Sequence, residues 1–372
     1  MAPKAFGIVS SADSSIYVEG LHDYRPIGSF SFLGRFRVID FPISNMSNSD
    51  INRIQVYVRS RPRSIAEHVG SGRHYNINSK RGKIQLLFSE NSSTRSIYNT
   101  DISAFLENID IIQRMHQDYV IIAPSYMVYK QDYRQVLDAH IASGADVTLL
   151  YQKVDNAREY FRGCKILNMN KQKGIESLEK NLGTAKEKNV FMDTYCMSKE
   201  VFINLIKEAA WESSIYTLAD IVNIKCKEMD IRGFQHRGYF AALTSLNDYY
   251  NASLELLDYN IASDLFRAEW PIYTRTTDSC PTKYLDTSKV TNSFVSNGCV
   301  IEGTVENSII GRGVTIKKGA VVRNSIIMAY AQIEEGIRVE NAVVDKWAKI
   351  IHAQNVHGES GRPQYIRRMD TL

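Results

Sequence analysis

The hydrophobic positions in the first 250 residues alternate between two patterns, one typical of buried strands and the other of amphipathic helices. Short apolar runs predict strands at 5–9, 51–58, 118–124 and 146–152. Between them, apolar residues recur at three- and four-residue spacing and predict helices over 101–117 and 132–144. This alternation indicates βαβ units and a mainly parallel sheet covered on both faces. Ligands bind such sheets at the carboxyl ends of the strands, so the loop after residues 5–9 is the first candidate for chemistry.

The C-terminal part of the chain carries a 17-residue repeat. The tetrapeptide Asn-Ser-Ile-Ile at 307–310 returns at 324–327, and Asn-Ala-Val-Val follows at 341–344. Three aliphatic columns keep this spacing: Ile316, Ile333 and Ile350; Val305, Val322 and Val339; and Ile310, Ile327 and Val344. Turns of three short strands must stack on one another to bury such columns. The pattern predicts a left-handed parallel β-helix of the hexapeptide type, and the alternative is a chance run of Val and Ile in a β-sandwich.

The stretch that precedes the repeat has no hydrophobic period. Residues 266–290 contain two prolines and several Thr and Asp, which is typical of a linker on the surface. We therefore predict an α/β domain over 1–255, a linker over 256–290 and a β-helix domain over 291–372. The last residues of that domain, from His352 onward, are polar and form a tail without a clear pattern.

Composition narrows the class of protein. The 372 residues are 44% hydrophobic and 23% charged, which is typical of a globular protein. The net charge of +4 is too balanced for a dedicated nucleic-acid binder. The five cysteines are scattered without a Cys-x-x-Cys pair, which favours reduced thiols in the cytoplasm over a zinc site. Because no stretch of eighteen apolar residues occurs and the first residues lack a signal-peptide core, we expect a cytoplasmic chain without a membrane partner.

Several segments resemble one enzyme family. The segment GRFRVIDFPISNMSNSDINRIQVYV at 34–58 is similar to GKYRIIDFPLSNCINSGI of the glucose-1-phosphate adenylyltransferases, or ADP-glucose pyrophosphorylases. Further similar segments follow in the same order at 97–112, 129–133, 238–257 and 297–328. The resemblance covers nearly the whole chain. It implies a Rossmann-like nucleotidyltransferase domain, with a mixed and mainly parallel sheet, followed by the left-handed parallel β-helix.

The family reaction joins glucose 1-phosphate to the α-phosphate of ATP and releases pyrophosphate. Catalysis of this kind rests on positioning and charge neutralisation. The family loop LAGGxGxRL falls on IVSSADSSIY at 8–17, where Ser10, Ser11 and Asp13 replace glycines and Ser15 replaces the arginine. Backbone N–H groups approach phosphates closely where glycine leaves room, so these changes oppose ATP binding.

The resemblance also implies a lysine and two magnesium-binding aspartates that this chain lacks. The lysine position falls on Ile27, and the aspartates fall on Tyr126 and Ala242. Mg²⁺ prefers carboxylate oxygens, so a relocated metal site would need another carboxylate such as Asp101 or Asp132. We predict neither catalytic residues nor metal ligands in this chain and no cofactor bound productively, with Mg²⁺ held by a catalytic partner.

Two positions of the family's sugar-phosphate site carry polar residues in this chain, and one of them departs from the family. The family lysine in EEKP falls on Lys180, which is followed by Asn181 in place of proline, and a sugar-contacting glycine falls on Asp193. We predict Lys180 and Asp193 as substrate-binding residues. The alternative for Lys180 is a solvated surface lysine.

A group of arginines is the candidate effector site. Arg35 falls on a family lysine linked to activator binding, and Arg59, Arg61 and Arg63 follow shortly after it. Clustered guanidinium groups suit a sugar bisphosphate or a similar anion. The alternative is a solvated charged loop.

The loss of the phosphate and metal positions from an otherwise intact pattern points to a role other than catalysis. The resemblance implies a GlgD-type, non-catalytic regulatory subunit that joins the catalytic subunit of ADP-glucose pyrophosphorylase in a heterotetramer for glycogen biosynthesis. Two alternatives remain: an active glucose-1-phosphate adenylyltransferase with a relocated metal site, and a stand-alone sugar-phosphate sensor.

Overall fold

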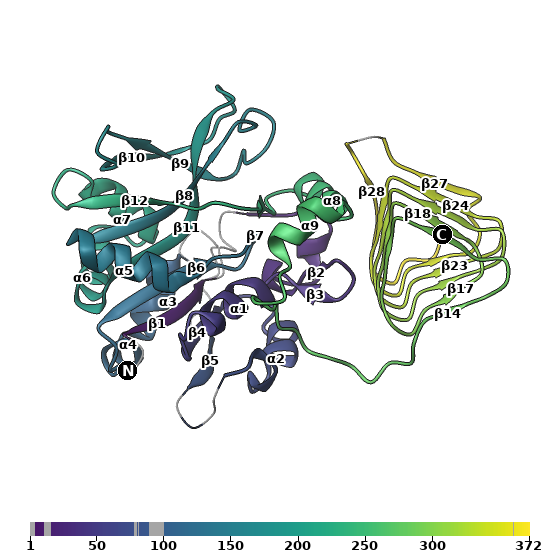
Figure 1. Cartoon of the computed structure of the whole chain (residues 1–372), viewed down its shortest axis with the longest axis horizontal. Helices are drawn as coiled ribbons and strands as arrows, with labels where there is room; N and C mark the ends of the chain where they lie inside the picture. Colours follow the sequence, from purple (N-terminus) through teal and green to yellow (C-terminus); the bar gives the residue numbers. More distant parts are fainter. Residues whose placement is uncertain (1–3, 11–15, 78–79, 81, 89–99, 360) are drawn as a thin grey trace.

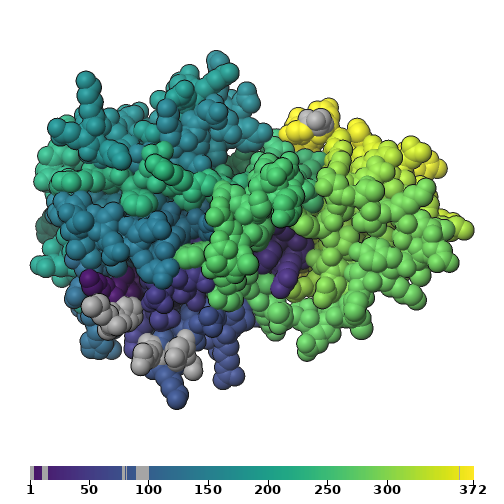
Figure 2. All heavy atoms as spheres, in the orientation of Figure 1, coloured from purple at the N-terminus to yellow at the C-terminus, as the bar shows by residue number. Residues whose placement is uncertain are grey.

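The computed structural model describes residues 4–10, 16–77, 80, 82–88, 100–359 and 361–372. The chain forms an α/β domain and a β-helix domain that lie side by side (Figure 1). Figure 2 shows that the β-helix packs directly against the α/β domain. None of the helices in the described part of the chain is long and apolar enough to cross a membrane.

The α/β domain is built on a nine-stranded mixed sheet. Its strands are β1 (Ala5–Ser10), β4 (Arg53–Val58), β5 (Lys83–Phe88), β6 (Tyr119–Pro124), β8 (Val147–Val154), β9 (Lys165–Met169), β10 (Ile175–Lys180), β11 (Lys188–Ser198) and β12 (Ile231–Gln235). The order β6-β1-β4-β5 is parallel throughout, and β11 then pairs antiparallel with both β6 and β8. All four strands predicted from the apolar runs are confirmed. Two smaller sheets pair β2 (Ser31–Phe32) with β3 (Phe36–Arg37), and β7 (Met127–Tyr129) with β13 (Phe240–Ala242).

Helices cover both faces of the large sheet, and a separate apolar cluster fills each side. They are α1 (Asp40–Asn48), α2 (Arg63–Val69), α3 (Asp101–Glu107), α4 (Ile109–Gln113), α5 (Tyr133–Ser143), α6 (Lys199–Glu212), α7 (Leu218–Lys225), α8 (Leu246–Glu255) and α9 (Tyr259–Leu265). Helix α5 is confirmed: Asp132 caps its start, and Gly144 ends it with φ 67°. The helix predicted over 101–117 is instead two short helices, because Asn108 lies between them and its amide binds the Ala104 carbonyl at 3.0 Å.

The β-helix consists of three five-stranded parallel sheets. Its strands are β14 (Lys283–Tyr284), β15 (Lys289–Thr291), β16 (Phe294–Val295), β17 (Val300–Ile301), β18 (Thr304–Glu306), β19 (Ile309–Ile310), β20 (Thr315–Ile316), β21 (Val321–Arg323), β22 (Ile326–Ile327), β23 (Gln332–Ile333), β24 (Arg338–Glu340), β25 (Ala342–Val344), β26 (Lys349–Ile350), β27 (Asn355–His357) and β28 (Gln364–Ile366). The three aliphatic columns lie one on each sheet and are completely buried. The predicted β-helix is therefore confirmed.

The structure places the ends of the β-helix differently from the sequence pattern. Helix α9 and strands β14 and β15 lie inside the segment predicted as a linker over 256–290. Val290 pairs with Val305, a spacing of 15 rather than 17 residues, so the first coil falls outside the repeat. The tail predicted to lack a pattern forms β27 and β28, whose inward residue is Ile366 where the repeat predicts position 361.

The remaining linker, 266–282, is held against α1. Asn45 accepts the Trp270 indole N–H at 3.0 Å, and Asn48 donates to the Pro271 carbonyl at 2.9 Å. The Ser44 hydroxyl accepts the Tyr273 N–H at 2.9 Å. Ser44, Asn45 and Asn48 of α1 thus bind the chain that leads into the β-helix.

Candidate functional site

The structure brings together the two positions where the family supplies magnesium-binding aspartates. Tyr126 directly precedes β7, and Ala242 ends β13, which pairs with β7 in antiparallel register. The next residue, Leu243, donates its N–H to the Tyr126 carbonyl at 3.0 Å. The two positions are therefore neighbours across one small sheet, as a shared metal site requires.

The side chains at these positions do not fit Mg²⁺. Tyr126 is buried, and its hydroxyl donates to Asp193 Oδ2 at 2.5 Å. Burial and the nearby Asp193 carboxylate raise the pKa of Tyr126 well above its usual value, so the phenol stays neutral. The methyl side chain of Ala242 offers no oxygen. Among the described residues, no group of three or more His, Cys, Asp or Glu is arranged to hold a metal ion.

Asp193 lies in a β-bulge with unusual backbone geometry. The pairing of β11 with β8 shifts register between Phe191 and Thr194, and Asp193 there has φ 45°. Glycine adopts this left-handed conformation without strain, which fits the family glycine at this position. The chain keeps the bulge and places a carboxylate in it, which the Tyr126 hydroxyl satisfies.

Aromatic side chains fill the space beside Ala242. The rings of Phe161 and Phe240 stack with centroids 5.1 Å apart and planes 5° apart. The pocket lined by both rings and Ala242 has a volume of about 150 Å³. Pockets for small molecules span roughly 300–1,000 Å³, so this one is too small for a sugar nucleotide.

Neither of the two carboxylates considered for a relocated metal site is unengaged. Asp132 caps α5 and binds the Arg134 guanidinium at 2.9 Å. Asp101 accepts backbone N–H groups of Ile102 at 2.9 Å and Leu218 at 3.1 Å. Burial raises the pKa of Asp101. Both carboxylates accept hydrogen bonds at the ends of helices.

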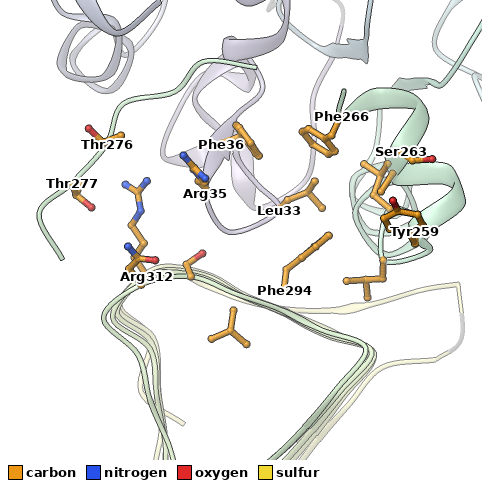
Figure 3. A pocket seen from close by; sticks show the side chains of 16 residues that line it. Leu33, Arg35, Phe36, Tyr259, Ser263, Phe266, Thr276, Thr277, Phe294 and Arg312 are labelled. Atoms are coloured by element: carbon orange, nitrogen blue, oxygen red, sulfur yellow. The ribbon is translucent and has the colours of Figure 1, made fainter. Parts of the chain in front are cut away.

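A larger pocket, the interdomain pocket, lies where the α/β domain meets the β-helix (Figure 3). Its volume is about 680 Å³. The turn after β2, helix α9, the linker and strand β16 with the coils beside it form the walls. Gly34, with φ 70°, lets the turn approach the β-helix, since a side chain there would meet Ser296 and the Ile310 carbonyl.

Two arginines on one side of the interdomain pocket face an apolar wall. Figure 3 shows Arg35 and Arg312 on the same side, with Phe294 and Phe266 across the space. Burial and the neighbouring Arg35 lower the pKa of Arg312. None of the described residues that line the pocket is acidic. This arrangement suits an anion with an apolar part.

The comparisons with known proteins agree with this geometry. The nucleotidyl transferase family matches residues 25–258, and the GlmU-like C-terminal hexapeptide family matches residues 281–362. The chain is 31% identical to the glycogen biosynthesis protein GlgD of Geobacillus stearothermophilus, over 87% of this chain and 84% of that protein. It is 30% identical to GlgD of Bacillus subtilis, over 84% of this chain and 81% of that protein.

A glucose-1-phosphate adenylyltransferase of Geobacillus stearothermophilus is 31% identical over 78% of this chain and 76% of that protein. The chain belongs to the glucose-1-phosphate adenylyltransferase family. Within this family it is similar over most of its length to the GlgD proteins. The family resemblance drawn from the sequence is confirmed.

The structure places the family's phosphate-binding positions as follows. Ser10 ends β1, and Ser11, Asp13 and Ser15 lie outside the described residues. Ile27 is 1% exposed and belongs to the core. Where the family has a phosphate-binding lysine, this chain therefore has a packing residue.

Lys180 and Asp193 lie on different strands. Lys180 ends β10, and its side chain is exposed. The next residue, Asn181, is buried and donates to the carbonyls of Ala157 and Phe161 at 2.8 and 3.0 Å. Asn181 thus fixes the loop where the family has proline, and the substrate-binding role of Lys180 stays a prediction.

Of the four predicted effector arginines, only Arg35 lines the interdomain pocket. Arg59 follows β4 and interacts electrostatically with Asp101. Arg61 donates to the His22 carbonyl, and Arg63 pairs with Glu67 at 2.7 Å. Sequence reasoning missed Arg312, because it lies in a β-helix coil far along the chain and occupies no aliphatic column.

Proposed function

We propose that this chain is a regulatory, catalytically impaired subunit of ADP-glucose pyrophosphorylase that acts in glycogen biosynthesis in the cytoplasm. It associates with a catalytic subunit in a heterotetramer and promotes or modulates formation of ADP-glucose from glucose 1-phosphate and ATP. Mg²⁺ is then held by the catalytic partner. The similarity to GlgD proteins and to a glucose-1-phosphate adenylyltransferase supports this assignment.

One observation carries the proposal. The β7–β13 sheet that presents the two metal positions is intact, but it presents Tyr126 and Ala242. A buried phenol and a methyl group cannot neutralise the charge that develops on a transferring phosphoryl group. The surrounding core and the β-helix columns are fully packed, which supports a chain that keeps the fold for a role other than the reaction.

The proposal includes an anionic sugar-phosphate effector at the interdomain pocket. Arg35 and Arg312 come from different domains and share this pocket without a lining carboxylate. An anion that binds both would neutralise two like charges and stabilise one relative placement of the domains.

Co-expression with the glucose-1-phosphate adenylyltransferase of the same organism tests the proposal. We expect one hetero-oligomer on size-exclusion chromatography and a several-fold rise in kcat/KM or in effector response relative to the catalytic chain alone. Arg35→Ala and Arg312→Ala should weaken the effector response, while Lys318→Ala, an exposed cation on the β-helix, should leave it unchanged. Separate elution with unchanged kinetics would contradict the proposal.

The active enzyme with a relocated metal site is tested on the chain alone with ATP, glucose 1-phosphate and Mg²⁺. Typical enzymes turn over at roughly 1–1,000 per second, and turnover within about a hundredfold of that range would favour this alternative. Asp193 is the carboxylate bound to Tyr126 at one of the altered positions, so Asp193→Asn should then abolish the activity. A stand-alone sensor would instead bind sugar phosphate in calorimetry without joining the catalytic chain.

A further inference from the structure

A second pocket, of about 570 Å³, lies within the α/β domain and shares no lining residue with the interdomain pocket. Five segments form it: the loop between β7 and α5, the first turn of α5, the turn between β9 and β10, the end of β12, and the start of the linker. We propose that this pocket, called the Lys130 pocket below, binds a phosphorylated small molecule.

The acidic side chains of the Lys130 pocket already have cationic partners. Asp132 accepts the Arg134 backbone N–H at 3.0 Å and its guanidinium at 2.9 Å. Glu269 lies 4.0 Å from the Arg267 guanidinium. Neither arginine lines the pocket, so both carboxylates are balanced from outside it.

Three cations of the pocket form no close ion pair with the described residues, although the Asp264 and Glu269 carboxylates act on Lys130 from farther away. Lys130, Lys173 and Arg237 line it, and none of them forms an ion pair within 4.0 Å with any residue in the described part of the chain. Burial, and then the positive charge of Arg267, lower the pKa of Lys130. A phosphate monoester carries about −1.5 to −2 charges at neutral pH and accepts several hydrogen bonds, which suits a pocket lined by three cations.

The backbone that carries these cations is well braced. Lys173 occupies a tight turn with φ 65°, in which the Asn170 side chain accepts the N–H groups of Gln172 and Gly174 at 2.9 Å each. Its carbonyl accepts the Gly233 N–H at 3.1 Å, which ties the turn to β12. A site on such fixed elements costs little ordering when a ligand binds.

An aromatic wall completes the Lys130 pocket. Trp270 and Phe234 line it together with the cations. The Trp270 indole N–H donates to Asn45 at 3.0 Å, and the Arg134 guanidinium lies 6.0 Å from its ring. The ring is therefore held in place beside the phosphate position, where it suits the sugar or base of a phosphorylated molecule. The volume lies in the range of small-molecule pockets.

Titration of the full-length chain with inorganic pyrophosphate, without Mg²⁺, tests the inference by calorimetry and by tryptophan fluorescence. Loss of one charge-assisted contact should weaken binding about tenfold or more, so Lys130→Ala and Arg237→Ala should each show this shift. Lys171→Ala is the matched control, because Lys171 lies in the same turn as Lys173, is likewise exposed and does not line the pocket. Trp270→Phe should remove the fluorescence change and leave the fold intact.

Two outcomes would overturn the inference. The first is no binding at millimolar pyrophosphate, or equal binding by the Lys130, Arg237 and Lys171 variants. The second is binding that Arg35→Ala abolishes and Lys130→Ala does not, which would place the anion in the interdomain pocket. Because neither readout needs a catalytic partner, the result is independent of the proposed regulatory role.

Discussion

The Tyr126–Asp193 hydrogen bond shows how the position to which the resemblance assigns a metal-binding aspartate becomes part of the core. Asp193 keeps a left-handed backbone conformation that costs a non-glycine residue of the order of 1–3 kcal/mol. The short contact from the buried Tyr126 hydroxyl offsets part of this cost and satisfies the carboxylate. Two substitutions that each look unfavourable alone therefore stabilise each other.

Tyr126→Phe should consequently destabilise the chain although it removes a single oxygen. The Asp193 carboxylate would lose the Tyr126 hydroxyl as its hydrogen-bond donor in a partly buried site, which costs about 1–3 kcal/mol. Urea denaturation measures this difference. Tyr284→Phe is the control, because Tyr284 is 52% exposed and its loss should change the free energy of unfolding little. Equal stability of the two variants would show that the Tyr126 contact contributes nothing.

His236 predicts a specific pH dependence of stability. It is buried beside Gln131, with Nδ1 2.8 Å from Oε1, and burial lowers its pKa to about 4 from an unfolded value of 6.5. His236 is therefore protonated below about pH 6.5 in the unfolded chain, but only below about pH 4 in the folded chain. Stability from this group is fully present above pH 6.5 and falls by roughly 3 kcal/mol as the pH approaches 4.

Denaturation profiles between pH 7 and pH 4 test this expectation. His236→Gln should show a flatter decline than the parent chain, and His357→Gln, which changes an exposed histidine, should keep the parent slope. A parallel decline of the His236 variant and the parent would contradict the assignment of the slope to this residue.

The candidate site could be predicted from the sequence where a single substitution changes the chemistry of a position. The resemblance identified Ile27, Tyr126 and Ala242 as substitutions at phosphate and metal positions, and the structure places all three in the core. It did not predict the Tyr126–Asp193 contact, because the two residues are on separate strands and the family has a glycine at one position. Pairings across the sheet depend on register, which a single sequence leaves open.

At the scale of elements, the geometry of the β-helix explains why asparagine recurs at equivalent corners. Asn307, Asn324 and Asn341 occupy equivalent corners with φ of 45°, 44° and 50°. Asparagine tolerates this left-handed region better than other side chains, and each corner turns the chain from one sheet to the next. The Asn that opens each repeat in the sequence is therefore a backbone requirement of the coil.

Substitution of Asn324 separates backbone strain from side-chain contacts. Asn324→Ala should cost about 1 kcal/mol, since alanine resists a positive φ, whereas Asn324→Gly should be close to neutral. The backbone carbonyl of this residue, which accepts the Tyr250 hydroxyl at 2.6 Å, is present in both variants. Thermal unfolding of the two variants gives the comparison, and an equal loss in both would point to the amide instead.

Strands could be predicted where burial gives the hydrophobic residues a regular spacing. They could not be predicted where a local feature of the chain interrupts that spacing. The columns through Ile316, Val305 and Ile310 recur because stacked coils must bury them. The first coil of the β-helix was not predicted from the repeat, because Gly303 makes a tighter corner. A side chain at Gly303 would meet the Ala320 carbonyl at 2.4 Å. Local structure also keeps two of the predicted effector arginines away from Arg35 at the interdomain pocket: Arg61 lies in a turn with φ 45°, and Arg63 begins a helix.

The two domains behave as one unit because a buried ion pair and an apolar seam join them. Arg25 pairs with Asp345 of the β-helix, and the side chains are 5% and 0% exposed. The Tyr365 hydroxyl also donates to Asp345 at 2.7 Å. Met328 and Val343 of the β-helix belong to the same apolar cluster as the α/β core. The two domains are therefore already packed together, and an effector in the interdomain pocket would bind to this packed arrangement.

More positive than negative side chains lie where the two domains meet, so the charge of Asp345 is important for the stability of the whole molecule. Burial and then Arg25 lower the pKa of Lys346 to about 7, so the charged ammonium is disfavoured next to the ion pair compared with a lysine in water. Asp345→Asn keeps the size of the side chain and removes its charge, which leaves Arg25 buried and uncompensated. Breaking a buried pair in this way costs about 3–5 kcal/mol.

A double-mutant cycle with Arg25→Met tests this account. Each single variant should lower the unfolding temperature and speed proteolysis in the linker at 266–282, because the β-helix then separates from the α/β domain more readily. The double variant should be more stable than the sum of the single effects predicts, since no unpaired buried charge remains. Calorimetry of the four proteins gives the coupling energy. If the single effects simply add, Arg25 and Asp345 are independent, and the apolar seam alone holds the domains together.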